Sequence, residues 1–112
     1  MIQMDKAIRY LSLAAKAGKI VIGAEDCEKI IKKGKAVCIL LAADAAPSAA
    51  KRAHDLSSFR KTPIINIAYT KTELAQAVGR GTSVAVAILT DAGLASAFEK
   101  AAAIALEQEE HI

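Results

Sequence analysis

The chain has 112 residues, of which 54% are hydrophobic, and its formal net charge is +3 at pH 7. That length suits one compact domain, and it allows a core to form without disulfide or metal support. The hydrophobic fraction excludes a disordered chain, and no apolar run approaches the ~20 residues of a membrane-spanning helix. The first residues show no signal-peptide pattern, so we expect a single cytoplasmic domain over residues 1–112 with no membrane partner.

Hydrophobic periodicity and capping residues predict the elements in chain order. The first half contains a helix over 5–17 capped by Asp5, a short edge strand at 20–22, a helix between Gly23 and Gly34, and a strand at 37–42. The second half contains a helix over 48–59 opened by Pro47, a strand at 64–68, a short helix from Thr70 or Thr72 to Val78, a strand at 84–89, and a final helix capped by Asp91.

The longer predicted strands are continuous apolar runs rather than alternating ones. Such runs are typical of a sheet covered by helices on both faces, and the strands alternate with helices along the chain. The fold class we expect is therefore α/β, as a three-layer α/β/α sandwich with a small mixed four-stranded sheet.

The two cysteines, Cys27 and Cys38, have neither the spacing of a zinc site nor that of a redox pair. Each lies on an apolar register, and free cysteine is among the most buried residue types. We therefore expect both in the core, and we expect no metal and no cofactor.

The sequence offers no catalytic constellation of nucleophile and base, paired carboxylates or cofactor loop. The Gly79–Gly81 segment lacks the rest of a dinucleotide fingerprint and precedes a strand instead of following one. Asp44 and Asp91 follow predicted strands, where α/β enzymes do carry acids, but helix capping explains both. The four aromatic residues are too few for a base-stacking platform.

Charge is unevenly distributed, because residues 1–35 hold eight basic side chains against four acids. This bias favours an anionic partner, with nucleic acid first. Two polar, glycine-containing segments could lie together at one end of the sheet: the Gly23 turn with its helix start, and the loop 79–83. Basic side chains on or beside these segments are Lys19, Lys29, Lys33 and Arg80. The alternative for the 24–33 helix is an ordinary amphipathic surface helix.

The order and spacing of several segments resemble the kink-turn RNA-binding superfamily of ribosomal proteins (L-seven-Ae and L-thirty-e type), and most closely its small bacterial YlxQ-type branch. The resemblance covers most of the chain and rests on residues 23–29, 33–36, 41–47, 62–63, 71–74, 77–79 and 84–95. It implies an α/β/α sandwich, in agreement with the residue patterns, and a non-enzymatic RNA-binding protein.

The family signature is Gly-x-Asn-Glu-x-x-Lys at the start of the second helix. Gly23 and Lys29 match it, Asp26 replaces Glu, and Glu25 replaces Asn. The second family contact, a mostly apolar loop against a flipped-out nucleotide, corresponds to a polar loop here. The RNA-binding residues that follow from the residue patterns and the resemblance are Lys19, Gly23, Glu25, Asp26, Lys29, Lys33, Arg80, Gly81, Thr82 and Ser83.

The departure at Glu25 has a physical consequence, because a carboxylate only accepts hydrogen bonds and repels phosphate, whereas an amide also donates.

The expected partner is a structured RNA, ribosomal RNA or another kink-turn RNA, bound by a monomer of ribosomal type. Two alternatives stay open at this point. One is a protein-interaction module, and the other is a small enzyme or the stand-alone substrate-recognition domain of an RNA-modifying enzyme.

Overall fold

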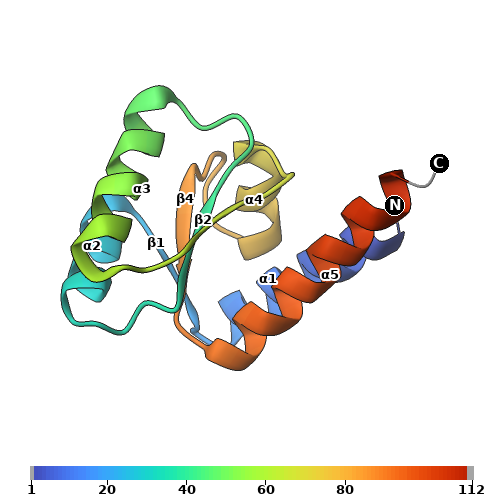
Figure 1. Cartoon of the computed structure of the whole chain (residues 1–112), viewed down its shortest axis with the longest axis horizontal. Coiled ribbons are helices and arrows are strands. Elements are labelled where there is room, and N and C mark those ends of the chain that lie inside the picture. The colour runs from blue at the N-terminus through green and yellow to red at the C-terminus, as the bar shows by residue number, and fades with distance from the viewer. Residues whose placement is uncertain (1, 111–112) are drawn as a thin grey trace.

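A computed structural model describes the backbone of residues 2–110 and the side chains of residues 6–102. The elements follow in the order α1 (Ile2–Lys16), β1 (Ile20–Ile22), α2 (Ala24–Lys32), β2 (Cys38–Leu41), α3 (Pro47–Arg60), β3 (Ile64–Asn66), α4 (Lys71–Val78), β4 (Val86–Leu89) and α5 (Ala92–Glu110). The sheet separates α2 and α3 on one face from α1, α4 and α5 on the other (Figure 1). This arrangement confirms the predicted three-layer α/β/α sandwich.

The sheet has four strands in the order β1-β4-β2-β3. Strand β4 pairs antiparallel with both β1 and β2, while β2 pairs parallel with β3. The prediction of a small mixed sheet with 20–22 as an edge strand is therefore confirmed. Because β1 runs along one border of the sheet, one side of its backbone has no neighbouring strand.

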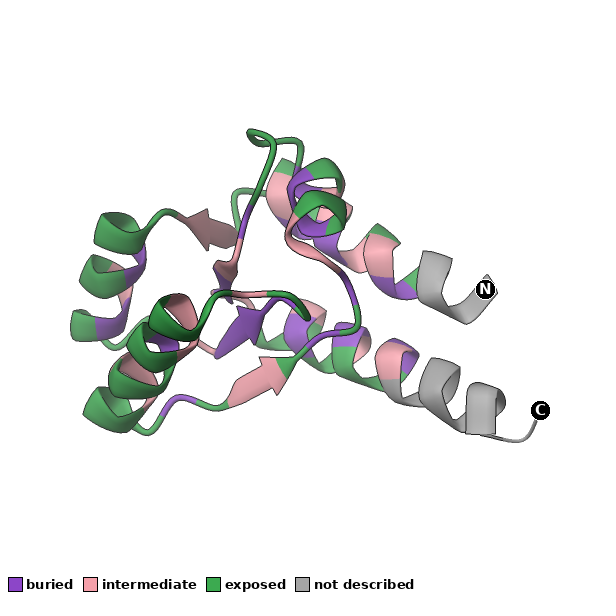
Figure 2. Cartoon of the chain, turned by 90° about the horizontal axis from the view of Figure 1, so that it is seen from above, coloured by how far each residue is buried: buried purple, intermediate pink, exposed green. Residues whose placement is uncertain are grey.

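Two apolar cores lie on the two faces of the sheet. Successive side chains of a strand point to opposite faces, so Cys38 and Leu40 of β2 join the core under α1, α4 and α5, and Ile39 and Leu41 join the one under α2 and α3. All four residues are buried, which explains why β2 reads as an unbroken apolar run. Figure 2 shows the buried positions on the sheet and on the inward sides of the helices.

Most predicted helix ends are confirmed. Pro47 occupies the first turn of α3, Thr70 forms a capping box with Glu73 at α4, and the Asp91 carboxylate accepts a hydrogen bond from the Leu94 N–H at 2.9 Å. Gly34 follows α2 with φ 72°, the left-handed conformation that glycine adopts without steric cost. These residues act locally, so the sequence alone identifies them.

Several details differ from the prediction, among them the end of β3, which is Asn66 rather than residue 68. Helix α1 begins at Ile2, so Asp5 lies inside the helix and does not cap it. Strand β4 begins only at Val86, because the Val84 N–H donates to the Lys71 carbonyl and not to a strand. Asp44 does cap a helix, but its carboxylate accepts from the Lys71 N–H of α4 at 2.7 Å rather than from the helix that follows it in sequence.

Cys27 and Cys38 are 2% and 1% exposed, which confirms that both belong to the core. Burial raises the pKa of each thiol from 9.0 to about 11, and the charges of Asp26 and Glu99 add to the effect at Cys27 and Cys38 respectively. Both thiols are therefore protonated and unreactive near neutral pH, because the thiolate is the nucleophile.

We expect both thiols to resist alkylation at about pH 8 in the folded protein and to react quickly in denaturant. Because the folded pKa of about 11 exceeds the ordinary 9.0, the folded state holds these protons more tightly. The resulting stability is fully present below pH 9.0 and is lost as the pH rises toward 11. Mass spectrometry after timed labelling, and urea unfolding across that pH range, measure both effects. Rapid labelling of both cysteines in the folded protein would contradict their place in the core.

Within the described part of the chain, no helix combines the length and apolarity needed to cross a membrane. The same residues contain no group of three or more His, Cys, Asp or Glu side chains placed to hold a metal ion.

Candidate functional site

The turn between β1 and α2 depends on Gly23. This residue has φ 100°, a conformation that side chains rarely adopt, although a Cβ atom there would meet nothing within 4 Å. It is also the N-cap of α2, and no side chain caps this helix. The backbone N–H groups of the first turn are therefore available to an acceptor from a ligand.

One face of α2 and the edge strand β1 enclose a hollow of about 280 Å³, which we call the β1 groove. It is lined by Ile20, Val21, Ile22, Asp26, Lys29, Ile30, Lys33 and Arg80. Asp26, Lys29 and Lys33 lie three and four residues apart, so they share one side of the helix. Isoleucine and valine side chains form the apolar part of the groove, and the charged side chains form the rest of its lining.

Arg80 reaches the groove from a distant part of the sequence. Helix α4 ends at Gly79 with φ 69°, and the N–H groups of Gly79 and Arg80 donate to the carbonyls of Gln76 and Ala75 at 3.3 and 3.1 Å. This turn reverses the chain and directs it back toward β1. Three cations and one carboxylate then meet in the groove, and the excess positive charge suits an anionic ligand with hydrogen-bond donors.

A second hollow, of about 370 Å³, lies on the other side of the α2 start between α2 and α3. Gly23 and Ser83 line it together, with Ser48 and Arg52 from α3. The structure therefore does bring the Gly23 turn and the end of the 79–83 loop together, as predicted. Arg52 is a residue that the sequence analysis missed, because its own helix shows it only as an exposed polar position.

Glu25 is separated from its neighbour Asp26. Successive helix residues point about 100° apart, and Glu25 lines a third hollow, of about 480 Å³, with Arg52 and residues of α2 and α3. In this hollow Glu28 forms an ion pair with Lys32 at 2.8 Å, and the hydrogen bond and charge of Lys32 lower the pKa of Glu28. Glu25 and Asp26 therefore face different surroundings.

Three other predicted residues line none of these hollows. Gly81 and Thr82 are exposed in the loop that follows α4, where Gly81 has φ 62°. Lys19 lies at the end of β1 opposite to Gly23, and its carbonyl accepts hydrogen bonds from both the N–H (2.9 Å) and the hydroxyl (3.1 Å) of Thr90. Lys19 is therefore separated from the Gly23 turn by β1, and its contact with RNA stays a prediction.

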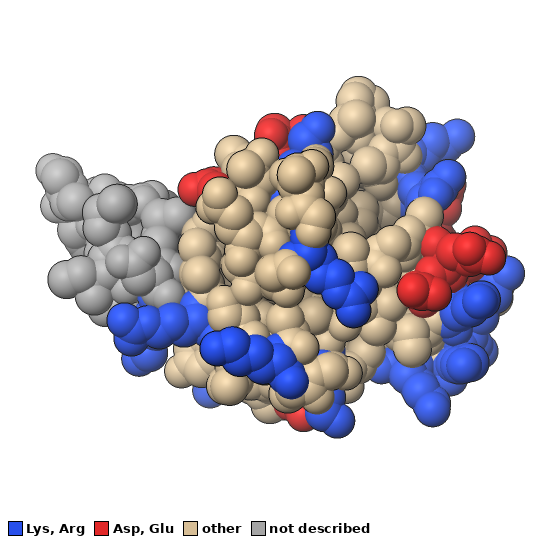
Figure 3. All heavy atoms as spheres, turned by 180° about the vertical axis from the view of Figure 1, so that it is seen from behind, with Lys and Arg blue, Asp and Glu red and all other residues tan. Residues whose placement is uncertain are grey.

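Basic side chains gather on the face that contains the β1 edge of the sheet. Figure 3 shows this face with lysine and arginine side chains over α2 at one side, at its centre, and along α1 toward the other side. Acidic side chains are fewer and stand mainly beside α2 and at the margins. The geometry is that of a broad basic surface with a small mixed-charge groove, which suits a large anionic partner better than a small enclosed substrate.

Residues 5–99 match the ribosomal protein L7Ae/L30e/S12e/Gadd45 family. The chain belongs to this family. It is 30% identical over 76 residues to the RNA-binding protein YlxQ of Enterococcus faecium, covering 68% of this chain and 73% of that protein. Membership of the family therefore extends over nearly all of the described sandwich.

Two solved structures share the fold of this family member. A protein of unknown function from Bacillus halodurans superposes with a TM-score of 0.76 at 24% identity, covering 86% of this chain and 95% of the other. The Giardia lamblia 15.5kD RNA binding protein superposes with a TM-score of 0.69 at 20% identity, covering 92% and 87%. The likeness to both supports the sandwich architecture.

In this L7Ae-family chain, the residues of the signature segment lie on two different surfaces. Gly23 caps α2, and Asp26 and Lys29 lie in the β1 groove, where they can act on one ligand. Glu25, at the position where the signature has Asn, lies instead in the hollow shared with α3 and Arg52. Its substitution therefore alters the α3 side of the site and leaves the β1 groove intact.

Proposed function

We propose that this chain binds a structured RNA of the kink-turn class at the β1 groove, the start of α2 and the loop 79–83. The observation that carries the proposal is the β1 groove, where α2 and the segment after α4 bring three cations and one carboxylate together. Family membership supports it, as do the names of two relatives, the RNA-binding protein YlxQ and the 15.5kD RNA binding protein.

The groove provides the two kinds of contact that RNA recognition needs. Lys29, Lys33 and Arg80 donate to phosphate oxygens or to the acceptor edge of guanine, and such contacts fix the position of the RNA. The Asp26 carboxylate accepts from the N–H groups of a base edge and adds selectivity. Gly23 and Gly81 have no side chain to keep the RNA backbone away.

The second hollow extends the proposed site toward α3. Arg52 lies there with Gly23 and Ser83, and it also lies in the third hollow with Glu25. A guanidinium binds phosphate in two parallel hydrogen bonds, so Arg52 offsets part of the repulsion from Glu25. We therefore add Arg52 to the residues that contact the RNA.

The proposed role is non-catalytic binding by a cytoplasmic monomer. The family takes its name from ribosomal proteins, which makes ribosomal RNA the first natural RNA to test. Crosslinking the protein to RNA in cells, followed by sequencing of the attached RNA, identifies the partner directly.

The decisive binding experiment compares two RNAs that differ only in the tandem sheared G·A pairs of a kink-turn. We expect tighter binding to the RNA that has these pairs, and a fall in affinity for both as salt increases, since phosphate contacts release counterions. Each RNA is titrated by fluorescence anisotropy at several salt concentrations. Equal affinity for the two RNAs would overturn the kink-turn assignment, and the absence of any salt-dependent binding would overturn the RNA-binding proposal itself.

Restoring the signature residue with Glu25→Asn is expected to tighten binding to the kink-turn RNA. The change removes an exposed negative charge near the phosphates and provides an amide donor. Exposed charge interactions contribute about 0.2–1 kcal/mol, so the gain should be roughly twofold to fivefold, measured in the same titration. The control is Glu99→Gln on α5, which removes the same charge from the opposite helical layer and should leave affinity unchanged. Weaker binding by the Glu25→Asn protein would contradict the repulsive role of this carboxylate.

A further inference from the structure

The outward face of α1 is basic. Lys6, Arg9, Leu13 and Lys16 are all exposed, and their spacing of three, four and three residues places them along one side of the helix. The opposite side, with Ala7, Leu11 and Ala14, is fully buried. Between residues 6 and 16 every charged side chain is a cation, and Asp5 is the one acid in the sequence before Glu25.

Ser12 fixes the direction in which two of these cations point. Its hydroxyl donates to the Ala77 carbonyl of α4 at 2.8 Å, so this side of α1 lies against α4. Arg9 and Lys16 are three residues before and four residues after Ser12, and therefore lie beside it on the helix surface. They border α4, the helix whose following turn carries Arg80 into the β1 groove.

Lys19 connects this basic side of α1 with β1. The Lys19 N–H donates to the Ala14 carbonyl at 2.8 Å, and the Thr90 N–H donates to the Lys19 carbonyl at 2.9 Å. These bonds hold the residue at the junction of the helix end and the sheet edge. Lys19 is followed directly by Ile20, the first residue of β1 and part of the groove lining.

The cations at this junction are not engaged elsewhere within the described side chains. Among residues 6–102 the one ion pair joins Lys32 to Glu28, so Arg9, Lys16 and Lys19 have no carboxylate partner in that range. Figure 3 shows basic side chains continuing from the α2 side of this face along α1. Unpaired, exposed cations in a row produce a positive potential that attracts a polyanion.

We propose that Arg9, Lys16 and Lys19 form a phosphate-binding track, the α1 track, which holds a double-helical arm of the RNA after it leaves the β1 groove. This inference rests on the proposed function and extends it to a second surface. The α1 track contains no aromatic residue, whereas single-stranded RNA is held largely by stacking on aromatic rings, so the track suits the phosphates of a duplex. The rise from Arg9 to Lys16 is about 10 Å, enough to contact successive phosphates of one strand.

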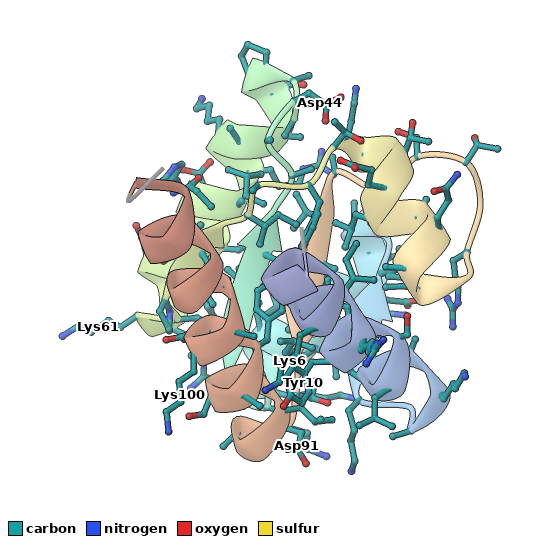
Figure 4. The ribbon with its side chains drawn as sticks, turned by 90° about the vertical axis from the view of Figure 1, so that its right-hand side faces the viewer. Lys6, Tyr10, Asp44, Lys61, Asp91 and Lys100 are labelled. Atoms are coloured by element: carbon teal, nitrogen blue, oxygen red, sulfur yellow. The ribbon has the colours of Figure 1, made fainter. Side chains whose placement is uncertain are left out.

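The test combines a double variant with RNAs of two stem lengths. Arg9→Gln with Lys16→Gln removes two charges from the α1 track and leaves the β1 groove untouched. The matched control is Lys61→Gln with Lys100→Gln, two exposed lysines that point away from the β1 edge, on the opposite side of the view in Figure 4. One kink-turn RNA has stems of about 12 base pairs, roughly one turn of an A-form helix. In the others, one stem at a time is shortened to about a third.

We expect the α1 track variant to lose about tenfold in affinity for the long-stem RNA at about 50 mM salt, and its salt slope to fall by roughly 1.4–1.8. For the RNA in which the stem held by the α1 track is shortened, the variant should bind as tightly as the wild type. The inference is overturned if stem length leaves the effect of the variant unchanged, or if the control variant weakens binding equally. If the wild-type protein binds none of the RNAs, the proposed function fails instead.

Discussion

Replacing both Lys29 and Arg80 by alanine is expected to weaken binding to the kink-turn RNA by roughly 10- to 100-fold. Both side chains line the β1 groove, from helix α2 and from the segment after α4. A lost phosphate contact lowers the salt slope by about 0.7–0.9, whereas a lost guanine contact costs about 1–3 kcal/mol and relaxes sequence preference. Titrations of each single variant and of the double variant at several salt concentrations separate the two kinds of contact.

The matched control for this pair is Lys51→Ala with Lys61→Ala. Both lysines are exposed, on α3 and directly after it, and neither lines a described hollow of the site. The control protein has the same net charge as the test protein, so it measures the effect of charge alone. Equal losses of affinity in the two proteins would mean that RNA binding depends only on net charge. The β1 groove would then have no role in recognition.

Phe98→Ala is expected to reduce the free energy of unfolding by about 3–5 kcal/mol. The ring is fully buried at 0% exposure in the core under α1, α4 and α5, so alanine leaves a cavity among side chains that relax only partly. Domains of this size have a total stability of about 5–15 kcal/mol, and the variant therefore loses a large share of it. Urea unfolding followed by circular dichroism measures the change.

The comparison for Phe98 is Phe59→Ala on α3. This ring is 61% exposed, with the Arg60 guanidinium 5.7 Å from its centre, and its removal opens no cavity. We expect a change within about 0.5 kcal/mol, as for most surface substitutions. If both phenylalanines cost the same, the core of the sandwich would not be where the structure places it.

The fold was predictable because its signals are local. Strand β2 is apolar at every position since both of its faces are covered, and Pro47, Thr70, Gly34 and Asp91 act on backbone groups within a few residues of themselves. Asp44 is the instructive exception. It was expected as a helix cap, but its partner, the Lys71 N–H, is 27 residues away, and no local pattern identifies such a pair.

The same distinction explains which parts of the candidate site were predicted. Asp26, Lys29 and Lys33 share one face of α2 by helical spacing alone, and Arg80 follows from its place in the glycine-containing loop 79–83. Arg52 was missed because only the packing of α3 beside α2 brings it to Gly23. Lys19 lies at the end of β1 away from Gly23, because the three residues of the strand separate them.

The packing of the first helix against the last has a consequence for how the chain acquires its structure. The most extensive contact between two helices joins α1 and α5, which lie at opposite ends of the described sequence. During synthesis from the N-terminus, the apolar side of α1 therefore stays without its main cover until α5 has left the ribosome. Contacts between such distant segments require closure of a long loop and slow the final step of folding. The α2–β2–α3–β3 segment, whose neighbours are close in sequence, can form before that step, and α1 joins the sheet late although it is made first.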